Sequence, residues 1–440
     1  MNSLLTFPRK ALSRTWNSPL ARNIALVSSG TAGAQLIAMA ISPVVTRIYG
    51  PEAFGLLGTY LALVTVVVPF AALAYPIAIV LPEEEREALG LVKLSVVLSF
   101  VIAVVAGVLM ALGDSWLATL LGAQAIEKFL ILIPLAMLFA ALMQTVEQWL
   151  IRKQEFGLIA RTALVHSFIL SSAKVGVGWL YPFGATLIAL ATVGHVLQAA
   201  LLYIGAKRQY HPVSSSSEKG RKVRLRELLL RYRDFPLYRA PQNLINAGSQ
   251  SLPVLMLAAF FGPAAAGFYT IAKMVMGMPA MLLGKAVNDV FYPRITEAAR
   301  RSENLQKHIV RATGALIAIG FLPFSVMIAF GPWLFSTVFG SEWASAGEYA
   351  QWLSVFFFFN FINKPSVAAV PALGIQRGLL FYEIFSTGAK IIGLLVGFYV
   401  LNSDLWAVAL FSLSGAFSYI LMMVWIVCCA SVRSSNEKAS

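Results

Sequence analysis

The sequence predicts an all-α protein that crosses a membrane about twelve times. The evidence is long apolar runs without a polar face, 58% hydrophobic against 12% charged residues, and a mean hydropathy of +0.75. A membrane-crossing helix needs about 20 mostly apolar residues, whereas a soluble helix of that length normally keeps a polar stripe. We therefore expect a polytopic membrane protein whose function concerns what crosses or lines the bilayer.

Each expected span is an apolar run long enough to cross a bilayer. The runs lie near residues 24–46, 55–81, 91–112, 129–150, 158–178, 183–205, 240–261, 265–290, 310–330, 345–371, 379–401 and 405–429.

Basic residues gather in every second gap between these runs. If the N-terminus is cytoplasmic, 27 of the 34 Lys and Arg lie on the cytoplasmic side, and only Arg47, Lys128 and Lys174 lie outside. Lys and Arg resist translocation, so this bias orients the chain and predicts that both termini are cytoplasmic. The net charge of +14 follows from the same bias and requires no nucleic-acid partner.

No signature of a metal, a cofactor or hydrolytic chemistry is present. The two cysteines, Cys428 and Cys429, are adjacent, and the four histidines lack the spacing of metal ligands. There is no glycine-rich phosphate loop followed by Lys-Ser/Thr. We therefore expect a protein that is not an enzyme and that does not hydrolyse ATP within this chain.

The first half of the chain recurs in the second half in the same order. Ala32-Gly33-Ala34-Gln35 returns as Ala247-Gly248-Ser249-Gln250, and Gly50-Pro51 with Gly55 returns as Gly262-Pro263 with Gly267. Parallel repeats of this kind are related by an axis along the membrane normal, and transporters bind substrate where the repeats meet. We predict two pseudo-symmetric six-helix bundles.

The predicted organisation is a first bundle over 1–205, a basic cytoplasmic linker over 206–236 and a second bundle over 237–440. Within the linker, residues 221–235 alternate leucines with arginines. That pattern suits a helix lying on an anionic leaflet, and equally a charge block that only sets topology.

Polar side chains inside the spans are the candidate substrate ligands. Arg239, Asn243, Asn246 and Gln250 follow one another at intervals of 4, 3 and 4, which places them on one stripe of a helix. Gln35 is the repeat counterpart of Gln250. Such stripes can bind helices together, but this one is polar enough to indicate a lumen lining.

Lysines at membrane depth are the second group of candidates. Lys273, Lys364 and Lys390 lie in apolar segments, and the first two have no acidic residue within one helical turn. Ionisable groups at this depth usually face a cavity or a partner, so they favour an anionic substrate. The alternative is that each lysine extends its ammonium to the membrane surface.

Three carboxylates are candidates for ion coupling. Glu147 lies near one end of its span, where the alternative is an ion pair with Arg152 or Lys153. Asp289 follows Lys285 by four residues, so the two can neutralise each other. Glu383 precedes Lys390 by seven residues, on one face of the helix but about two turns away.

Three stretches carry a resemblance to a known family. They are 29–55, which includes Ser42-Pro43-Val44-Val45-Thr46-Arg47-Ile48-Tyr49-Gly50-Pro51, then Gln148-Trp149-Leu150-Ile151-Arg152-Lys153, and 234–294 with Asp234-Phe235-Pro236 and Phe291-Tyr292-Pro293-Arg294. They resemble the Wzx-type polysaccharide flippases, which belong to the superfamily of multidrug and toxic-compound extruders. The resemblance spans most of the chain.

The resemblance implies a fold like that of these extruders and a cationic lumen between two bundles. It also implies a substrate, an oligosaccharide on undecaprenyl pyrophosphate, that is moved from the cytoplasmic to the periplasmic leaflet of a bacterial inner membrane. The expected product is O-antigen or a related polysaccharide, and the expected partners are membrane lipids, a polysaccharide polymerase and a chain-length regulator. The alternative is an ion-coupled multidrug antiporter of the same fold.

Overall fold

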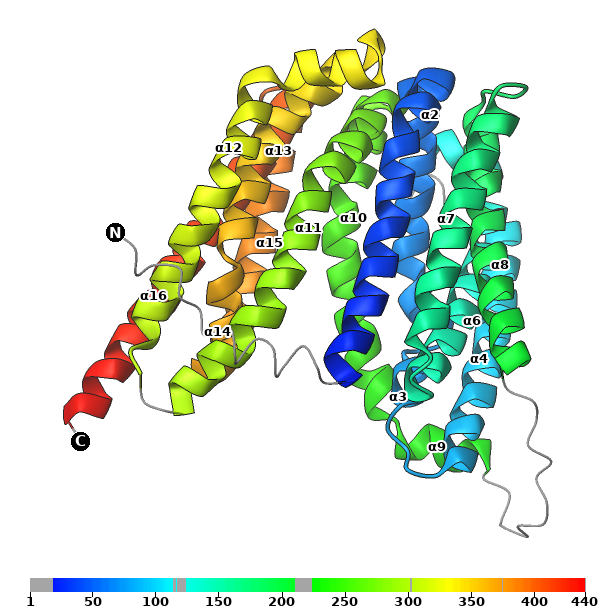
Figure 1. The fold of residues 1–440 in the computed structure, drawn as a ribbon. Coiled ribbons are helices and arrows are strands. Elements are labelled where there is room, and N and C mark those ends of the chain that lie inside the picture. Colours follow the sequence, from blue (N-terminus) through cyan, green and yellow to red (C-terminus); the bar gives the residue numbers. More distant parts are fainter. Residues whose placement is uncertain are drawn as a thin grey trace. The chain divides into compact units, whose positions relative to one another are not determined.

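A computed structural model describes residues 19–113, 116, 124–209, 224–300, 303–373 and 375–439, and these residues form helices and the turns between them. Figure 1 shows the arrangement of the chain. The expected spans are mostly helical, because long apolar stretches can satisfy their backbone hydrogen bonds in a membrane only within a helix or a closed barrel. The run 55–81 is interrupted by turns at 72–74 and after residue 78, and the run 345–371 is broken at Asn363. Nine described helices are long and apolar enough to cross a membrane, or up to ten with one bent pair.

The chain divides into two compact units. Unit 1 comprises Met1–Ile48 and Tyr60–Ser251, and unit 2 comprises Tyr49–Thr59 and Leu252–Ser440. A short piece of the N-terminal half, Tyr49–Thr59, thus belongs to unit 2, and the start of the seventh predicted span belongs to unit 1.

Unit 1 contains most of the N-terminal helices. Its main elements are α2 (Pro19–Ala71, in part), α3 (Tyr75–Ala78), α4 (Glu85–Leu112), η1 (Gln124–Leu132), α6 (Ile133–Arg152), α7 (Phe156–Gly178), α8 (Gly184–Gln209), α9 (Leu225–Arg231), η2 (Phe235–Arg239) and the first half of α10 (Ala240–Phe261). In unit 1, α6 packs against both α4 and α8, and α7 packs against α8. Large apolar side chains such as Phe100 and Leu109 point outward from α4, as expected for a surface in contact with lipid.

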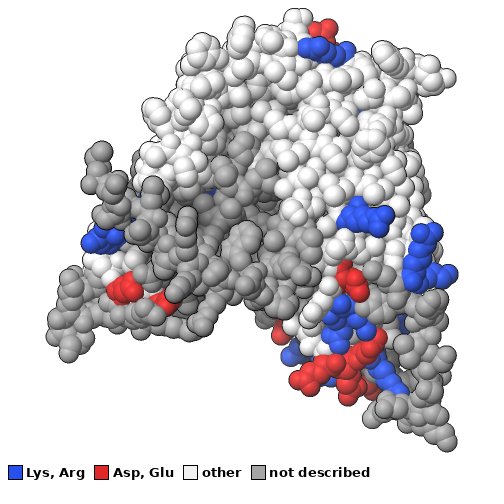
Figure 2. Space-filling view, viewed as in Figure 1, with Lys and Arg blue, Asp and Glu red and all other residues white. Residues whose placement is uncertain are grey.

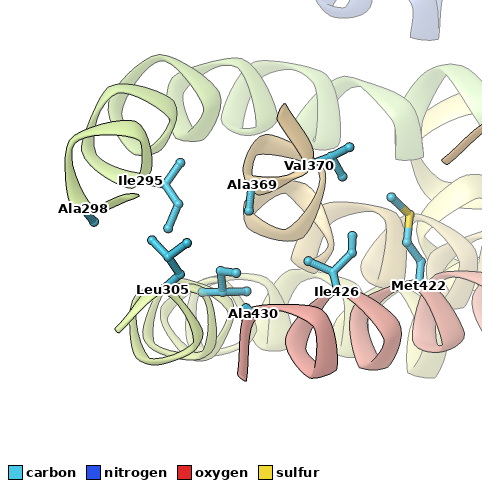
Figure 3. Packing of buried hydrophobic residues seen from close by; sticks show 9 residues of the cluster. Ile295, Ala298, Leu305, Ala369, Val370, Met422, Ile426 and Ala430 are labelled. Atoms are coloured by element: carbon cyan, nitrogen blue, oxygen red, sulfur yellow. The ribbon is translucent and has the colours of Figure 1, made fainter. Parts of the chain in front are cut away.

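Unit 2 contains the C-terminal helices. Its remaining elements are α11 (Pro263–Arg300), α12 (Leu305–Phe339), η3 (Ser341–Trp343), α13 (Ala344–Ile362), α14 (Lys364–Leu373), α15 (Gln376–Tyr399) and α16 (Asp404–Ala439). At one end, α11, α12, α14 and α16 meet in a core of small and branched side chains. Figure 3 shows this core, which consists of Ile295, Ala298, Leu305, Ile309, Ala369, Val370, Met422, Ile426 and Ala430.

The backbone confirms the sequence repeat at its two Gly-Pro turns. Gly50 and Gly262 have φ of 69° and 90°, a region that glycine enters at no steric cost, and a helix resumes at the proline that follows each. Within unit 2, a Cβ on Gly55 would overlap the carbonyl of Pro263, and a Cβ on its counterpart Gly267 would overlap the carbonyl of Pro51. The two corresponding segments therefore cross backbone to backbone.

The second part of the basic linker packs on α3 and α4 within unit 1. Leu228 of α9 is 1% exposed. It belongs to a core cluster with Tyr75 of α3, Ile79 at the C-terminal end of α3, and Leu91 of α4. The helix α9 is thus shorter than the one expected over 221–235 and docks on protein through Leu228, whereas Leu225 and Leu230 stay exposed. A position on an anionic leaflet and a role as a charge block that sets topology both stay predictions; residues 221–223 lie outside the described range.

Ion pairs and hydrogen bonds stabilise the packing of α9 against α4. We call Glu85, Glu87, Arg152, Lys153, Arg231 and Tyr232 the α4–α9 cluster. Glu87 accepts from Arg231 at 2.7 Å and from the Tyr232 hydroxyl at 3.1 Å, and Lys153 pairs with Glu85 at 2.7 Å. In Figure 2, acidic and basic side chains gather at the lower right, where Figure 1 labels α9. Burial, followed by the adjacent Glu87 carboxylate, raises the pKa of the Tyr232 phenol.

Candidate functional site

Polar groups from three helices of unit 2 meet at membrane depth. We call Asn360 of α13, Tyr382, Glu383 and Lys390 of α15, and Tyr419 of α16 the α15 cluster. The Asn360 amide donates to the Tyr419 hydroxyl at 2.6 Å. Glu383 interacts electrostatically with both tyrosines and with Lys390. The sequence-predicted pair Glu383 and Lys390 therefore belongs to one site rather than to two separate ones.

A glycine of α16 makes room for this site. A Cβ on Gly415 would overlap the ring of Phe356 and would lie 3.4 Å from Cδ of Lys390. The Phe356 ring in turn packs against Tyr419, with centroids 5.5 Å apart. The α15 cluster thus combines an ammonium, a carboxylate, an amide and aromatic faces, which together can hydrogen-bond and stack on a polar ligand.

The other two candidate lysines lie on neighbouring helices. Lys273 is half-buried on α11, and Lys364 is half-buried as the first residue of α14. Because α14 packs against both α11 and α15, the three helices that carry Lys273, Lys364 and Lys390 are consecutive neighbours in unit 2. No carboxylate among the described side chains acts on Lys364.

Lys364 lies at a break in its span. The helices α13 and α14 are bent by 42° there, and Pro365 lacks the N–H that would continue the helical hydrogen bonding. Asn363, 1% exposed, donates to the sulfur of Met422 at 3.3 Å. Interrupted helices at membrane depth are where transporters commonly expose polar backbone to substrate.

The amide stripe of α10 is preserved only in part. Gln250 donates to Asn246 at 2.7 Å, and Asn246, Gln250 and Arg239 are exposed, while Asn243 and Gln35 are half-buried. Arg239, however, ends the π-helical turn η2 and donates to Gln242 at 2.9 Å. A π turn has more residues per turn than an α-helix. The four-residue spacing from Arg239 to Asn243 therefore does not by itself place the two side chains on the same face of the helix.

Glu147 is not neutralised by either of its neighbouring basic residues. It is half-buried on α6. Arg152 donates instead to the carbonyls of Ile79, Pro82 and Glu83, and Lys153 pairs with Glu85. These contacts favour partners other than Glu147 for both basic residues, and Glu147 stays a predicted candidate for ion coupling. The side chain of Asp289, like that of Lys285, lies outside the described residues.

Sequence reasoning missed Asn360, Tyr382 and Tyr419. The available signal was an amide directly after the run Phe356–Phe359, one helical turn before Asn363 and Lys364 of the same span. Tyrosine is common in apolar helices, so neither Tyr382 nor Tyr419 could be distinguished by spacing.

The helices and their polar groups define a polytopic membrane protein of the fold shared by multidrug extruders and lipid flippases. The chain belongs to the polysaccharide biosynthesis protein family, whose model matches residues 44–348. This match confirms the resemblance to polysaccharide flippases, and the similar solved structures confirm the fold class expected from the sequence.

Individual relatives are distant. The teichuronic acid biosynthesis protein TuaB of Bacillus subtilis (strain 168) is 18% identical over 176 residues, which is 40% of this chain and 35% of that protein. The matched stretch thus spans about a third of this curated relative.

Two solved structures show the fold. The lipid II flippase MurJ in an inward closed conformation aligns with a TM-score of 0.69 at 11% identity, covering 94% of this chain and 90% of MurJ. An outward-facing multidrug resistance MATE family transporter of the MOP superfamily aligns with a TM-score of 0.60 at 14% identity, covering 95% and 96%.

Proposed function

We propose that this protein is a flippase that moves an undecaprenyl-pyrophosphate-linked oligosaccharide from the cytoplasmic to the periplasmic leaflet of a bacterial inner membrane. The main support is the presence of three lysines on the neighbouring helices α11, α14 and α15 of a protein from a polysaccharide biosynthesis family. Charged groups at this depth are costly unless they serve a ligand or a partner, and an ammonium attracts pyrophosphate and acidic sugars.

The α15 cluster supplies what a sugar chain requires. Asn360 and Tyr419 offer hydrogen bonds, Phe356 offers an apolar face, and Lys390 and Glu383 offer opposite charges. The amide stripe Asn243, Asn246 and Gln250, with Gln35, would add neutral ligands, and the prenyl chain would stay in lipid. A polymerase and a chain-length regulator are the expected partners on the product side.

Deletion of the gene, with analysis of undecaprenyl-linked glycans, tests this function. We expect single repeat units to accumulate on the cytoplasmic leaflet and long-chain polysaccharide to disappear from the surface. Normal export in the deletion strain would refute the proposal.

The proposed topology has a separate test. A cysteine at Ser216, in the linker, should react only with reagents that reach the cytoplasm, after Cys428 and Cys429 are replaced. Labelling from the periplasm would refute the orientation with cytoplasmic termini.

Glu147 supports a second candidate, an ion-coupled multidrug antiporter. Its half-buried carboxylate has neither Arg152 nor Lys153 as a partner, and such a group can exchange a proton or cation during transport. The Glu147→Gln variant distinguishes the two. An antiporter would lose drug resistance, whereas a flippase would show a defect only in glycan export.

A further inference from the structure

One face of the linker helix α9 is not covered by unit 1. Leu228 is buried among residues of α3 and α4, but Leu230, two residues further on, lies on almost the opposite side of the helix and is 62% exposed. Arg226 lies one turn before Leu230 on that same side and is exposed, as is Arg233 in the turn after α9. The linker therefore presents a large apolar side chain between two guanidinium groups.

The two arginines on this face are not used to dock the helix. That role belongs to Arg231, whose guanidinium pairs with Glu87 at 2.7 Å. Among the residues that the structure describes, none forms a hydrogen bond or ion pair with the side chain of Arg226 or Arg233. Residues 224–239 contain five arginines and two acidic residues, so the segment carries a net positive charge. Its outward guanidinium groups are available to an anionic ligand.

The exposed face lies where the bilayer meets water. The span that includes α10 begins at Phe235, two residues after Arg233, and α9 packs on the first turns of α4, whose span begins at Glu85. Figure 1 shows α9 at that end of α4. The apolar exposure continues from α9 into the membrane, because Leu237 and Tyr238 at the start of the α10 span are 60% and 73% exposed. Two adjoining spans thus place α9 at the depth of the lipid headgroups.

This position suits both kinds of exposed side chain. A leucine at headgroup depth can enter the acyl boundary, and a guanidinium forms paired hydrogen bonds with a phosphate. A charge block that only sets topology needs neither a docked helix nor an outward leucine. We propose that Arg226, Leu230 and Arg233 form a binding surface for anionic phospholipids of the adjacent leaflet. The guanidinium groups bind the headgroup phosphates, and Leu230 enters the acyl boundary.

This surface is separate from substrate transport and does not rest on the function proposed above. Leu228 and Arg231 hold α9 on unit 1, while the lipid binds its other side, so the helix is fixed between protein and membrane. An anionic leaflet attracts basic side chains near its surface, and a neutral leaflet does not. We therefore expect the depth of α9 to depend on the anionic lipid content of the membrane.

Electron paramagnetic resonance of a spin label at position 230 tests the surface. The label is attached to Leu230→Cys in the full-length protein, after Cys428→Ser and Cys429→Ser remove the native thiols. The protein is placed in nanodiscs of phosphatidylcholine, with or without phosphatidylglycerol. Collisions of the label with oxygen report burial in lipid, and collisions with a water-soluble nickel chelate report exposure to water. We expect the oxygen-to-nickel ratio to rise about twofold or more when phosphatidylglycerol is present.

Charge variants assign the effect to the two arginines. Arg226→Gln with Arg233→Gln in the labelled protein should abolish the response to phosphatidylglycerol, while the docking ion pair of Arg231 is unchanged. The matched control is Lys307→Gln with Arg311→Gln, which removes two exposed positive charges from the start of α12 in unit 2. This control should keep the full response.

Three results would overturn the surface. One is an oxygen-to-nickel ratio that does not respond to phosphatidylglycerol, and another is an equal response with and without the two arginines. The third is a label that is immobilised in native membranes yet stays accessible to nickel in nanodiscs with phosphatidylglycerol, which would assign this face to a protein partner. None of these measurements involves export, so each result is independent of the test of the flippase function.

Discussion

Basic side chains have opposite surroundings in two regions of the molecule. In the α4–α9 cluster of unit 1, Arg152, Lys153 and Arg231 each have a defined carbonyl or carboxylate partner. In unit 2, Lys364 lies at a helix break without a described carboxylate acting on it, and Lys390 shares Glu383 with two tyrosines. We therefore propose that charge serves stability in the first region and ligand binding in the second.

Loss of the deep lysines should have the largest effect. The Lys273→Gln, Lys364→Gln double variant keeps bulk and polarity but removes two charges, so long-chain polysaccharide at the surface should fall about tenfold or more. The variant with Arg at both positions should lose less, because the charge remains. Export is measured relative to the amount of protein in the membrane. Full export by the Gln variant would mean that these lysines are structural, and the comparison would fail.

Arg152→Ala should mainly affect stability. The substitution leaves three carbonyls without their donor, which costs about 2 kcal/mol in the free energy of unfolding. Lys153→Ala is the control, because its partner Glu85 is 58% exposed and such pairs contribute about 1 kcal/mol or less. Thermal unfolding in detergent measures both. Equal losses of stability in the two variants would show that the contacts of Arg152 with the carbonyls do not stabilise the fold.

Tyr419→Phe should have a smaller effect on stability and a selective one on transport. It removes the hydroxyl that accepts from Asn360, a loss of about 1 kcal/mol, and it keeps the ring against Phe356. We expect weaker export with nearly normal protein levels. A variant with wild-type export would exclude the hydroxyl from the binding site.

The smallest expected effect concerns Tyr232 at high pH. Its pKa is raised from the ordinary 10.0, so the folded protein favours the neutral phenol. This contribution to the docking of α9 is complete below about pH 10 and is lost as pH rises through the raised pKa. Proteolysis after Arg231 should therefore accelerate above pH 10 in the wild type. Tyr232→Phe should remove that acceleration, and an unchanged pH profile in the variant would contradict the assignment.

Much of the fold could be predicted because apolar length alone determines where a helix can cross a membrane. The turns at Gly50 and Gly262 could also be predicted from local sequence, because a Gly-Pro pair indicates a turn followed by the start of a helix. The partners of the charged residues could not be predicted from the sequence. Arg152 bonds to carbonyls about 70 residues away along the chain, and no sequence spacing encodes that contact.

The candidate site was predicted in part. Lys390 and Glu383 could be found because ionisable residues are rare in spans, whereas Asn360 and Tyr419 join them only through the packing of α13, α15 and α16. For residues 221–235 the sequence could not locate the apolar face, because leucines among arginines look the same whether that face meets lipid or protein. The expectation that Gln35 and Gln250 line a cavity stays a prediction, and a structure with both side chains facing lipid would refute it.

The crossing at Gly55 and Gly267 has a consequence for the history of the gene. If the two halves arose by duplication, most positions were free to change independently afterwards. These two were not, because the space left by each missing side chain is occupied by the main chain of the other copy. A mutation at either glycine cannot be compensated by a smaller neighbouring side chain, since the neighbour is a peptide carbonyl. Both positions should therefore remain glycine, so that the repeat stays recognisable there long after the surrounding sequences have diverged.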